Sequence, residues 1–340
     1  MPVNYFDPTF SSFAYDQIDH TDQLPYIFYE DYRLVPGGCD AIGITFWTGN
    51  FNNHTNVVND LLPKTKKLLI FAPEPVKIDQ FINFINLFEN HPQVTVFGNA
   101  SLNFKNPKNY IAVPNWFIDC ENFYVTKSWA KRLLASLTFD FNKPKKFDCL
   151  LGKEKSHRNL IEKKYLESNH KDEIIFTYFK NDILSGSWDF DIQGSSVTGK
   201  EIVIDGEIGR ISAILPINIY NNSHYSIVAE TTSSNDYSHF TEKTAKPLVA
   251  KRPFVMFAGQ HFLKNLHSLG FKTFDTVIDE TYDSIENQDL RFAAAWEQVE
   301  RLCELDPVAV ISRLTPTLIH NRQHFLNTSW HDLIRKSIVL

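Results

Sequence analysis

Short apolar runs alternate with amphipathic segments in the first part of the chain. Buried β-strands are predicted for four of these runs: Ala41–Trp47, Lys67–Phe71, Val94–Phe97 and Tyr110–Val113. Ile78–Glu89 places its apolar residues at helical spacing, and Ser128–Leu137 is a second predicted helix. Apolar strands that alternate with helices are typical of a parallel sheet covered by helices on both faces.

The same alternation restarts after Asn142–Lys146, a polar stretch interrupted by proline that we interpret as a linker. The strands predicted beyond it are Phe147–Leu151, Glu173–Phe179, Tyr225–Ala229 and Phe254–Phe257. The predicted helices are Arg158–Glu167, Thr241–Lys251, His261–Leu269, Asp289–Leu305 and a segment from Val308 onward. Residues 181–212 are rich in Gly, Ser and Asp, so we expect a surface excursion or hairpin there.

Two strand–helix halves joined by a short linker predict two Rossmann-like domains facing a cleft. We place the first at residues 1–142 and the second at residues 147–315, followed by a C-terminal helical segment at 316–340. Residues 319–336 have apolar side chains partly at helical spacing. This helix either crosses back to the first domain or packs on its own domain.

Composition narrows the classes of function. The chain has 340 residues, 43% of them hydrophobic, and a net charge of −6, which disfavours a protein that binds nucleic acid through nonspecific phosphate contacts. The four cysteines are far apart and form no Cys-x-x-Cys pair, as expected for free thiols in a reducing compartment. The N-terminal residues lack a signal-peptide pattern, and no apolar stretch is long enough to cross a bilayer. We therefore expect a cytoplasmic protein.

A predicted strand ends at Glu230 and is followed by a polar loop and a helix that opens with Thr241-Glu242-Lys243. Threonine is a good helix N-cap, and the free N–H groups and dipole of a helix N-terminus attract anions. A phosphate bound there would explain the lysine in the first turn, and Glu242 could hydrogen-bond ribose hydroxyls. The alternative is an ordinary capped surface helix with an incidental Glu-Lys pair.

A second segment of interest is Cys149–Arg158, where a strand runs into a glycine-containing loop with several basic residues. Lys153, Lys155 and Arg158 would lie at the carboxyl end of the strand, which is the usual ligand edge of an α/β sheet. The forked guanidinium of arginine suits diphosphate oxygens. A solvated basic turn is the alternative, but both segments belong to the same predicted domain and would share one edge.

Other motifs are absent or weak. The chain has no Walker motif and no Gly-x-Gly-x-x-Gly fingerprint. Asp189-Phe190-Asp191 matches the Asp-x-Asp pattern of metal-dependent glycosyltransferases, but it lies in the polar excursion without an apolar strand before it. We therefore expect no metal site. The acidic cluster Asp279–Asp283 is interpreted as a solvated loop, with an acceptor-lining role as the alternative.

The stretch Ser226–Phe274 resembles the donor-binding motif of the α1,3-fucosyltransferase family of GT-B glycosyltransferases. Ala229–Thr232 corresponds to the family's strand end, and His239–Lys243 to its Thr-Glu-Lys helix start, although the Asn of the first run and the Tyr of the second are absent. Pro253–Val255 fits the family's next strand. Gly270–Phe274 is similar to a tail found in bacterial and phage-type glycosyltransferase-like proteins.

The resemblance implies an inverting glycosyltransferase with a GT-B fold that uses a nucleoside-diphosphate sugar without a metal or other cofactor. Arg158 and Lys243, together with Lys153 and the Thr241 cap, would bind the diphosphate. Glu242 would bind the ribose, and Glu230 the sugar or the ribose. The acceptor would be a glycan, a small molecule, a protein or a modified nucleic-acid base.

A carboxylate from the first domain acts as the catalytic base in the resembling family. Glu74 is our first candidate because it follows the predicted strand Lys67–Phe71 in a Pro-Glu-Pro turn. A rigid turn residue is the alternative interpretation of Glu74, and His54 is an alternative base. Two rival functions remain: a noncatalytic GT-B-like binding or scaffold protein, and another nucleotide-dependent α/β enzyme.

Overall fold

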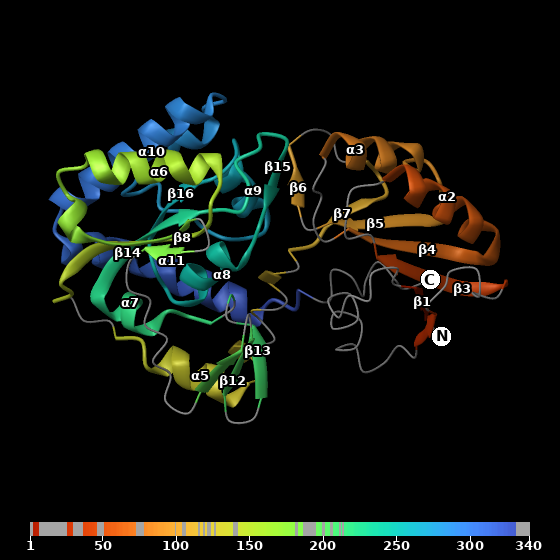
Figure 1. Ribbon diagram of the computed structural model, residues 1–340, viewed down its shortest axis with the longest axis horizontal. Helices are drawn as coiled ribbons and strands as arrows, with labels where there is room; N and C mark the ends of the chain where they lie inside the picture. Colours follow the sequence, from red (N-terminus) through yellow and green to blue (C-terminus); the bar gives the residue numbers. More distant parts are fainter. Residues whose placement is uncertain are drawn as a thin grey trace. The chain divides into compact units, whose positions relative to one another are not determined.

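The computed structural model describes residues 3–6, 26–29, 37–45, 51–72, 78–98, 100–103, 107–114, 116–117, 120, 124–125, 127–138, 142–180, 183–185, 195–198, 201–204, 207–210, 212 and 214–330. The chain divides into two compact units, the first comprising Met1–Ile118 with Ser329–Leu340 and the second Asp119–Thr328. Each unit contains a sheet of mainly parallel strands together with helices (Figure 1). The predicted α/β class is confirmed, and the fold is Rossmann-like.

The first unit contains a six-stranded sheet in the order β2-β1-β3-β4-β5-β7, and every neighbouring pair is parallel. Its strands are β1 (Val3–Phe6), β2 (Tyr26–Tyr29), β3 (Cys39–Thr45), β4 (Thr65–Ala72), β5 (Val94–Gly98) and β7 (Tyr110–Ala112). The remaining elements are α2 (Phe51–Leu61), η2 (Leu62–Lys64), α3 (Ile78–Leu87) and β6 (Ala100–Leu102). The core is built from β4, which is buried from Leu68 to Ala72, and from the apolar face of α3.

The division between the units lies upstream of the linker that we placed at Asn142–Lys146. Helix α5 (Ser128–Ala135) belongs to the second unit because hydrogen bonds attach the residues after it to Asn221: Thr138 N donates to Asn221 Oδ1 at 2.8 Å, and Asn221 Nδ2 donates to Ser136 O at 3.1 Å. Lys145 and Lys146 already belong to the next strand, β8. The polar, proline-containing stretch is therefore part of a folded unit.

The second unit contains a five-stranded sheet in the order β10-β9-β8-β14-β16, in which only the edge strand β10 is antiparallel. Its strands are β8 (Lys145–Lys153), β9 (Ile174–Lys180), β10 (Ile183–Ser185), β14 (Ser223–Ala229) and β16 (Phe254–Phe257). Helices α6 (Ser156–Glu167) and α10 (Gln288–Glu304) pack together on one face, and α8 (Glu242–Val249) packs with α11 (Pro307–Asn327) on the other (Figure 1). The helices and strands are largely those that the sequence pattern predicts.

The shorter elements of the second unit complete this layout. They are η4 (Lys171–Glu173), α7 (Ile217–Asn222), β15 (Tyr237–His239), α9 (Phe262–Ser268) and η6 (Glu280–Ser284). The described parts of the expected excursion form β10 and a separate antiparallel sheet of β11 (Ser195–Thr198), β12 (Glu201–Ile204) and β13 (Glu207–Arg210).

Helix α11 runs through Pro316 without ending there, so the expected boundary at residue 316 is not a break in structure. The helix belongs to the second unit, and the chain joins the first unit at Ser329. Within the first unit, the indole of Trp330 packs edge-on against Phe117 with ring centroids 5.5 Å apart. The rest of the expected C-terminal helix, residues 331–340, lies outside the described residues.

A polar group is buried at the amino end of the second sheet. Arg252 is 4% exposed, and its Nη2 lies 2.5 Å from Asp148 Oδ2. Ser223 and Ser226 donate to the same carboxylate oxygen, each at 3.0 Å. The guanidinium also donates to the carbonyls of Tyr220, Ser223 and Tyr225 at 2.8 to 2.9 Å, and it lies 4.1 Å from the centre of the Tyr220 ring. This buried ion pair joins β8 to the start of β14 and β16, with its hydrogen-bonding groups satisfied.

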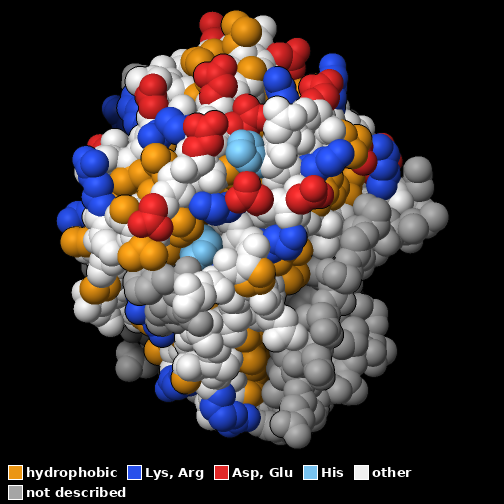
Figure 2. Space-filling model, turned by 90° about the vertical axis from the view of Figure 1, so that its left-hand side faces the viewer, with side chains coloured by type: hydrophobic (Ala, Val, Ile, Leu, Met, Phe, Trp, Pro, Cys, Tyr) orange, Lys and Arg blue, Asp and Glu red, His pale blue; other side chains and the backbone are white. Residues whose placement is uncertain are grey.

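Within the described part of the chain, no helix is long and apolar enough to cross a membrane. Figure 2 shows one face of the molecule, on which Lys and Arg side chains are interspersed with Asp and Glu side chains. The coloured side chains of this face form no continuous basic stripe of the kind that nucleic-acid-binding proteins present.

Candidate functional site

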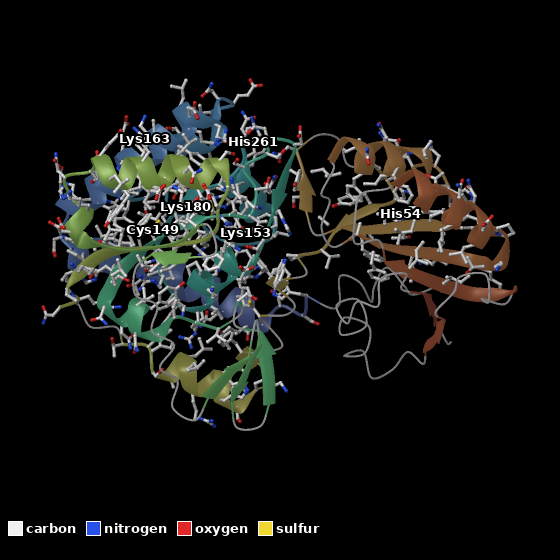
Figure 3. The ribbon with its side chains drawn as sticks, in the orientation of Figure 1. His54, Cys149, Lys153, Lys163, Lys180 and His261 are labelled. Carbon is white, nitrogen blue, oxygen red and sulfur yellow. The ribbon has the colours of Figure 1, made fainter. Side chains whose placement is uncertain are left out.

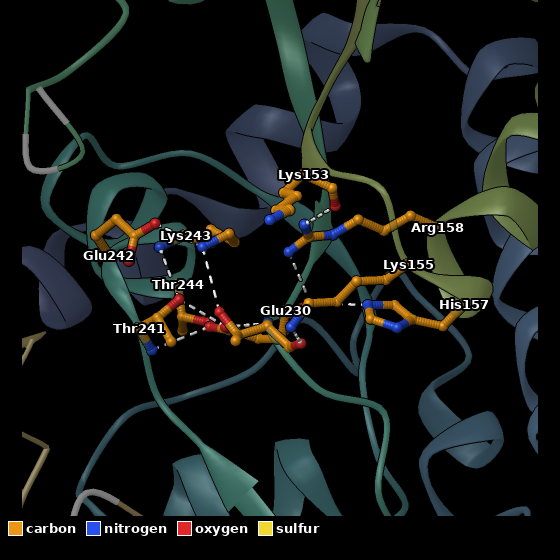
Figure 4. A network of polar contacts seen from close by, with 10 residues as sticks. Lys153, Lys155, His157, Arg158, Glu230, Thr241, Glu242, Lys243 and Thr244 are labelled. Atoms are coloured by element: carbon orange, nitrogen blue, oxygen red, sulfur yellow. Dashed lines mark hydrogen bonds and ion pairs between the residues drawn. The ribbon is translucent and has the colours of Figure 1, made fainter. Parts of the chain in front are cut away.

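The strand order of the second sheet reverses between β8 and β14. The chain leaves β8 through α6 to form β9 on one side, and it leaves β14 through α8 to form β16 on the other. Open α/β sheets bind ligands outside the carboxyl ends of their strands at such a reversal. Lys153 ends β8, and Glu230 directly follows β14 (Figures 3 and 4). Both segments singled out in the sequence therefore meet at this point.

The segment after β8 brings positive charge to this edge. Lys153 is exposed, and Lys155 Nζ donates to Thr231 O at 2.7 Å, which connects the loop after β8 to the loop after β14. Lys155 is also the N-cap of α6, without a capping side-chain hydrogen bond, and the first turn of α6 contains no acidic residue. The positive end of the helix dipole thus adds to the charge of the lysines.

Arg158 lies in the first turn of α6 and is 3% exposed. Its Nη1 donates to Lys153 O at 2.6 Å and its Nη2 to Glu230 O at 3.4 Å, while the buried Nε has no hydrogen-bond partner. Burial lowers the pKa of this guanidinium, and the nearby Glu230 acts in the opposite direction. Arg158 is therefore a buried cation whose hydrogen-bond partners are carbonyl oxygens.

His157, beside Arg158, was not among the site residues expected from the sequence. Its Nε2 lies 3.0 Å from Glu230 O, so the first turn of α6 holds the end of β14 through two side chains. Burial, reinforced by the cations of Arg158, Lys155 and Lys243, lowers the pKa of His157 to about 4. The ring is neutral at neutral pH, and His157 serves as a positioning residue.

Glu230 holds the end of β14 to the start of α8. The residue is 0% exposed, and its carboxylate accepts four hydrogen bonds. Oε1 accepts from Thr241 N at 3.1 Å and from Thr244 Oγ1 at 2.5 Å. Oε2 accepts from Thr241 Oγ1 at 2.6 Å and from Thr231 N at 2.9 Å. These contacts give Glu230 a positioning role in place of the sugar or ribose contact that we expected.

Helix α8 begins as predicted, with Thr241 as its N-cap accepting from Lys243 N at 3.3 Å. Lys243 Nζ lies 2.5 Å from Glu242 Oε1 and 3.4 Å from Thr231 Oγ1 (Figure 4). Burial opposes ionisation of Glu242, but the cations of Lys243 and Lys246 outweigh it and lower the pKa of Glu242 below its ordinary value. Glu242 is thus an anion held beside Lys243.

The polar loop after β14 is fixed by residues that the sequence analysis did not single out. A side chain at Gly259 would place its Cβ 1.8 Å from Ser234 O, so only glycine allows the loop to lie this close. Buried Arg291 donates to Ala258 O at 3.0 Å and to Glu286 O at 3.0 Å. A glycine two residues after the predicted strand Phe254–Phe257 was the signal available for Gly259, whereas nothing in the local sequence marks Arg291.

The first-unit candidates are placed as follows. Glu74, our first candidate for a base, lies outside the described residues. His54 is half-buried in the first turn of α2 and not in a loop, because the helix begins at Phe51 (Figure 3). Asp189 and Asp191 also lie outside the described residues.

Two carboxylates of the acidic cluster Asp279–Asp283 are not solvated as we expected, whereas Asp279 is exposed at the N-cap of η6. Asp283 accepts from Leu263 N at 3.0 Å and Lys264 N at 3.1 Å, at the start of α9. Glu280 accepts from Thr273 Oγ1 at 2.5 Å and Phe274 N at 2.7 Å, and burial raises the pKa of Glu280 to about 7. Backbone N–H groups thus bind these carboxylates, and the cluster ties η6 to neighbouring segments.

The site therefore combines Lys153, Lys155, Arg158 and Lys243 with the N-termini of α6 and α8. Its two carboxylates, Glu230 and Glu242, are engaged with the protein itself. Such an arrangement suits an anionic ligand, above all one with several phosphate oxygens. Among the described residues, no group of three or more His, Cys, Asp or Glu side chains is arranged to hold a metal ion. No protein-family model matches this chain, and no curated protein is similar to it in sequence.

Proposed function

We propose that this protein is an inverting glycosyltransferase of the GT-B type that uses a nucleoside-diphosphate sugar without a divalent metal. The observation that supports this most directly is the convergence of cations from two separate strand ends at the point where the strand order reverses. Lys155 and Arg158, from the segment after β8, reach Thr231 O and Glu230 O at the end of β14, and Lys243, from the helix after β14, reaches Thr231 Oγ1. A diphosphate placed there would lie near positive charge from the segment after β8 and from the segment after β14.

In this reaction an acceptor hydroxyl oxygen attacks the anomeric carbon, and the bond from that carbon to the diphosphate oxygen breaks. The leaving diphosphate keeps the electron pair, so its negative charge grows in the transition state. Lys243 and Arg158 are the residues that we assign to this charge, because fixed cations stabilise the transition state without reorganisation. The acceptor proton passes to a base, for which Glu74 and His54 remain the candidates.

The resemblance of Ala229–Lys243 to the fucosyltransferase motif supports the choice of a sugar nucleotide over other phosphorylated ligands. The N-cap at Thr241 and the neighbouring Glu242–Lys243 pair, 2.5 Å apart, agree with a helix start that binds ribose and diphosphate. The GT-B arrangement, in which the first unit presents the acceptor to the second across a cleft, is part of the proposal.

The test is a thermal shift of the full chain with GDP, UDP, CDP, TDP and ADP, each with divalent ion and with EDTA. A ligand that binds only the folded state raises the melting temperature, so one nucleotide should stand out in EDTA. Lys243→Ala should reduce this shift. The matched control is Lys163→Ala, because the Lys163 side chain is 70% exposed on α6 and lies in that helix outside the first turn.

Turnover is then measured as release of the selected nucleotide from its sugar conjugates with and without acceptors. Release that depends on Lys243 supports the enzyme. Binding without release on any conjugate contradicts catalysis and favours the noncatalytic binding protein. A shift that requires the ion contradicts the metal-free proposal and favours another nucleotide-dependent enzyme. No shift with any nucleotide contradicts the donor site itself.

A further inference from the structure

A cavity of about 200 Å³ lies in the second unit, near the amino ends of β14 and β16. Its lining includes His224 from β14, Lys251 from the turn before β16, and Ile311, Leu318 and Ile319 from α11. The sites proposed above lie at the other ends of these strands. The cavity is therefore separate from the proposed nucleotide site, although α8 leads from one to the other.

The charged residues that line this cavity are all cationic. They are Lys143, Lys251 and Arg252, and no Asp or Glu is among the lining residues. The charge of Arg252 is balanced by Asp148. Lys143 Nζ donates to Tyr220 O at 2.6 Å, which holds its ammonium group beside another lining residue, and Lys251 adds a second positive charge. Most of the remaining wall is apolar. An occupant should accordingly combine an apolar body with an anionic group.

His224 gives an independent reason to expect a ligand. His224 is only 4% exposed, and its buried Nδ1 atom has no hydrogen-bond partner. A buried polar atom without a partner is costly, and a bound molecule with an oxygen atom could supply one. Burial, together with Lys143, Lys146 and Arg252, lowers the pKa of His224 to about 4. Because the His224 ring is neutral, the anionic group of the ligand would be bound by the lysines.

The volume limits the size of the occupant. A dry cavity of about 150 Å³ is large enough for benzene, so a cavity of about 200 Å³ has room for one ring and a short substituent. A whole nucleotide or a long-chain fatty acid is too large to be enclosed in this space. The combined size, charge and apolar lining leave a small organic acid as the best match.

We propose that this cavity binds a small aromatic monocarboxylate of about the size of phenylacetate. The ring packs against Leu318, Ile311 and Leu137, the carboxylate lies near Lys143 and Lys251, and an oxygen atom pairs with His224 Nδ1. This proposal does not depend on the glycosyltransferase proposal, since it uses none of the same side chains.

The probes are benzoate, phenylacetate and 3-phenylpropanoate, with phenylacetamide and phenethylamine as neutral and cationic analogues. Binding to the full chain is measured by calorimetry and thermal shift. We expect at least one acid to bind at least tenfold more tightly than both analogues. Ile319→Trp fills the cavity from its rim, where Ile319 is 42% exposed, and should weaken binding of that acid at least tenfold. Leu290→Trp is the matched control, because Leu290 is 62% exposed and is not a lining residue.

Lys251→Asn removes the charge without backbone strain, because Lys251 has a φ of 54° and Asn tolerates that conformation. We expect this variant to weaken binding of the acid about fivefold or more while retaining the shift produced by the nucleotide. Three results would overturn the proposal: no binding of any acid, equal binding of the amide or amine, or unchanged binding in Ile319→Trp.

Discussion

Two buried arginines lie at opposite edges of the second sheet, and their surroundings differ. Arg252, at the amino edge, forms an ion pair with Asp148 and donates to three carbonyls and two serine hydroxyls. Arg158, at the carboxyl edge, donates to two carbonyls, and its buried Nε has no partner. The two side chains are almost equally buried, at 4% and 3% exposure.

Under the proposed function, this difference separates a structural cation from one that binds a ligand. A buried guanidinium with a carboxylate partner has its charge balanced by the protein itself. A guanidinium bonded to carbonyls leaves charge that an anionic ligand can balance. The nearby carboxylate of Glu230 acts on this charge through space, but it is not a hydrogen-bond partner of Arg158, and its oxygens bind Thr231, Thr241 and Thr244. Burial alone therefore does not tell which arginine serves the fold.

The largest effect should come from breaking the structural pair. Arg252→Met leaves Asp148 buried without its cation, and we expect the free energy of unfolding to fall by about 3–5 kcal/mol. Urea denaturation measures this loss. The double variant Asp148→Val with Arg252→Met should recover most of it, since an apolar pair can replace a buried ion pair. Equal stability of the single and double variants would contradict the ion-pair interpretation.

A smaller effect on folding and a large one on binding should follow from Arg158→Met. The variant loses two hydrogen bonds to carbonyls, so the free energy of unfolding should fall by about 1–2 kcal/mol. Affinity for the nucleoside diphosphate selected by the thermal-shift panel should fall about 10- to 100-fold, which is the cost of one charged hydrogen bond. Calorimetry measures the dissociation constant of the nucleotide for the wild type and for the variant. An unchanged dissociation constant would remove Arg158 from the site.

The two edges also share a dependence on pH through His157 and His224, because burial lowers the pKa of each to about 4. In the unfolded chain these rings have a pKa near 6.5. As the pH falls from 6.5 towards 4, these histidines become protonated in the unfolded state but stay neutral in the folded state. The free energy of unfolding therefore falls. His157→Gln should reduce the loss of unfolding free energy between pH 7 and pH 4.5 by about 1–2 kcal/mol.

Urea titrations at the two pH values measure this difference, and His224→Gln should change it in the same direction. The prediction fails if His157→Gln and the wild type lose the same stability on acidification.

The smallest effect should come from Lys153→Ala at the exposed end of β8. Stability should not change measurably, because an exposed side chain of this kind contributes little. Nucleotide affinity should fall about two- to fivefold at low salt, and the difference should shrink in 0.5 M salt because of screening. A loss that is independent of salt would indicate a direct and buried contact.

Much of the sheet was predictable from the sequence because its strands are apolar on both faces. The run Lys67–Phe71 lies inside β4 (Thr65–Ala72), and the helix predicted from Ile78 begins at that residue. The short strands β1 and β2 were not predicted, since a strand of four residues is too short to give a periodic signal. The expected boundary at residue 316 lies inside α11, which continues through Pro316 because packing outweighs one lost hydrogen bond.

The site was predictable only in part. The Thr241 cap and the position of Arg158 follow from local sequence patterns, and the structure has both at one edge. The role of Glu230 did not follow, because a carboxylate after a strand can face a ligand or a helix, and only the fold decides. Asp279–Asp283 was misinterpreted for the same reason: its partners are backbone N–H groups from distant segments.

The Asp148–Arg252 pair also has a consequence for sequence drift. The two positions are 104 residues apart, yet a change at either one alone leaves a buried charge uncompensated. Diverging copies of this chain should therefore retain both residues or replace both with apolar ones. Such joint substitution would mark β8 and the start of β16 as spatial neighbours in any collection of related sequences.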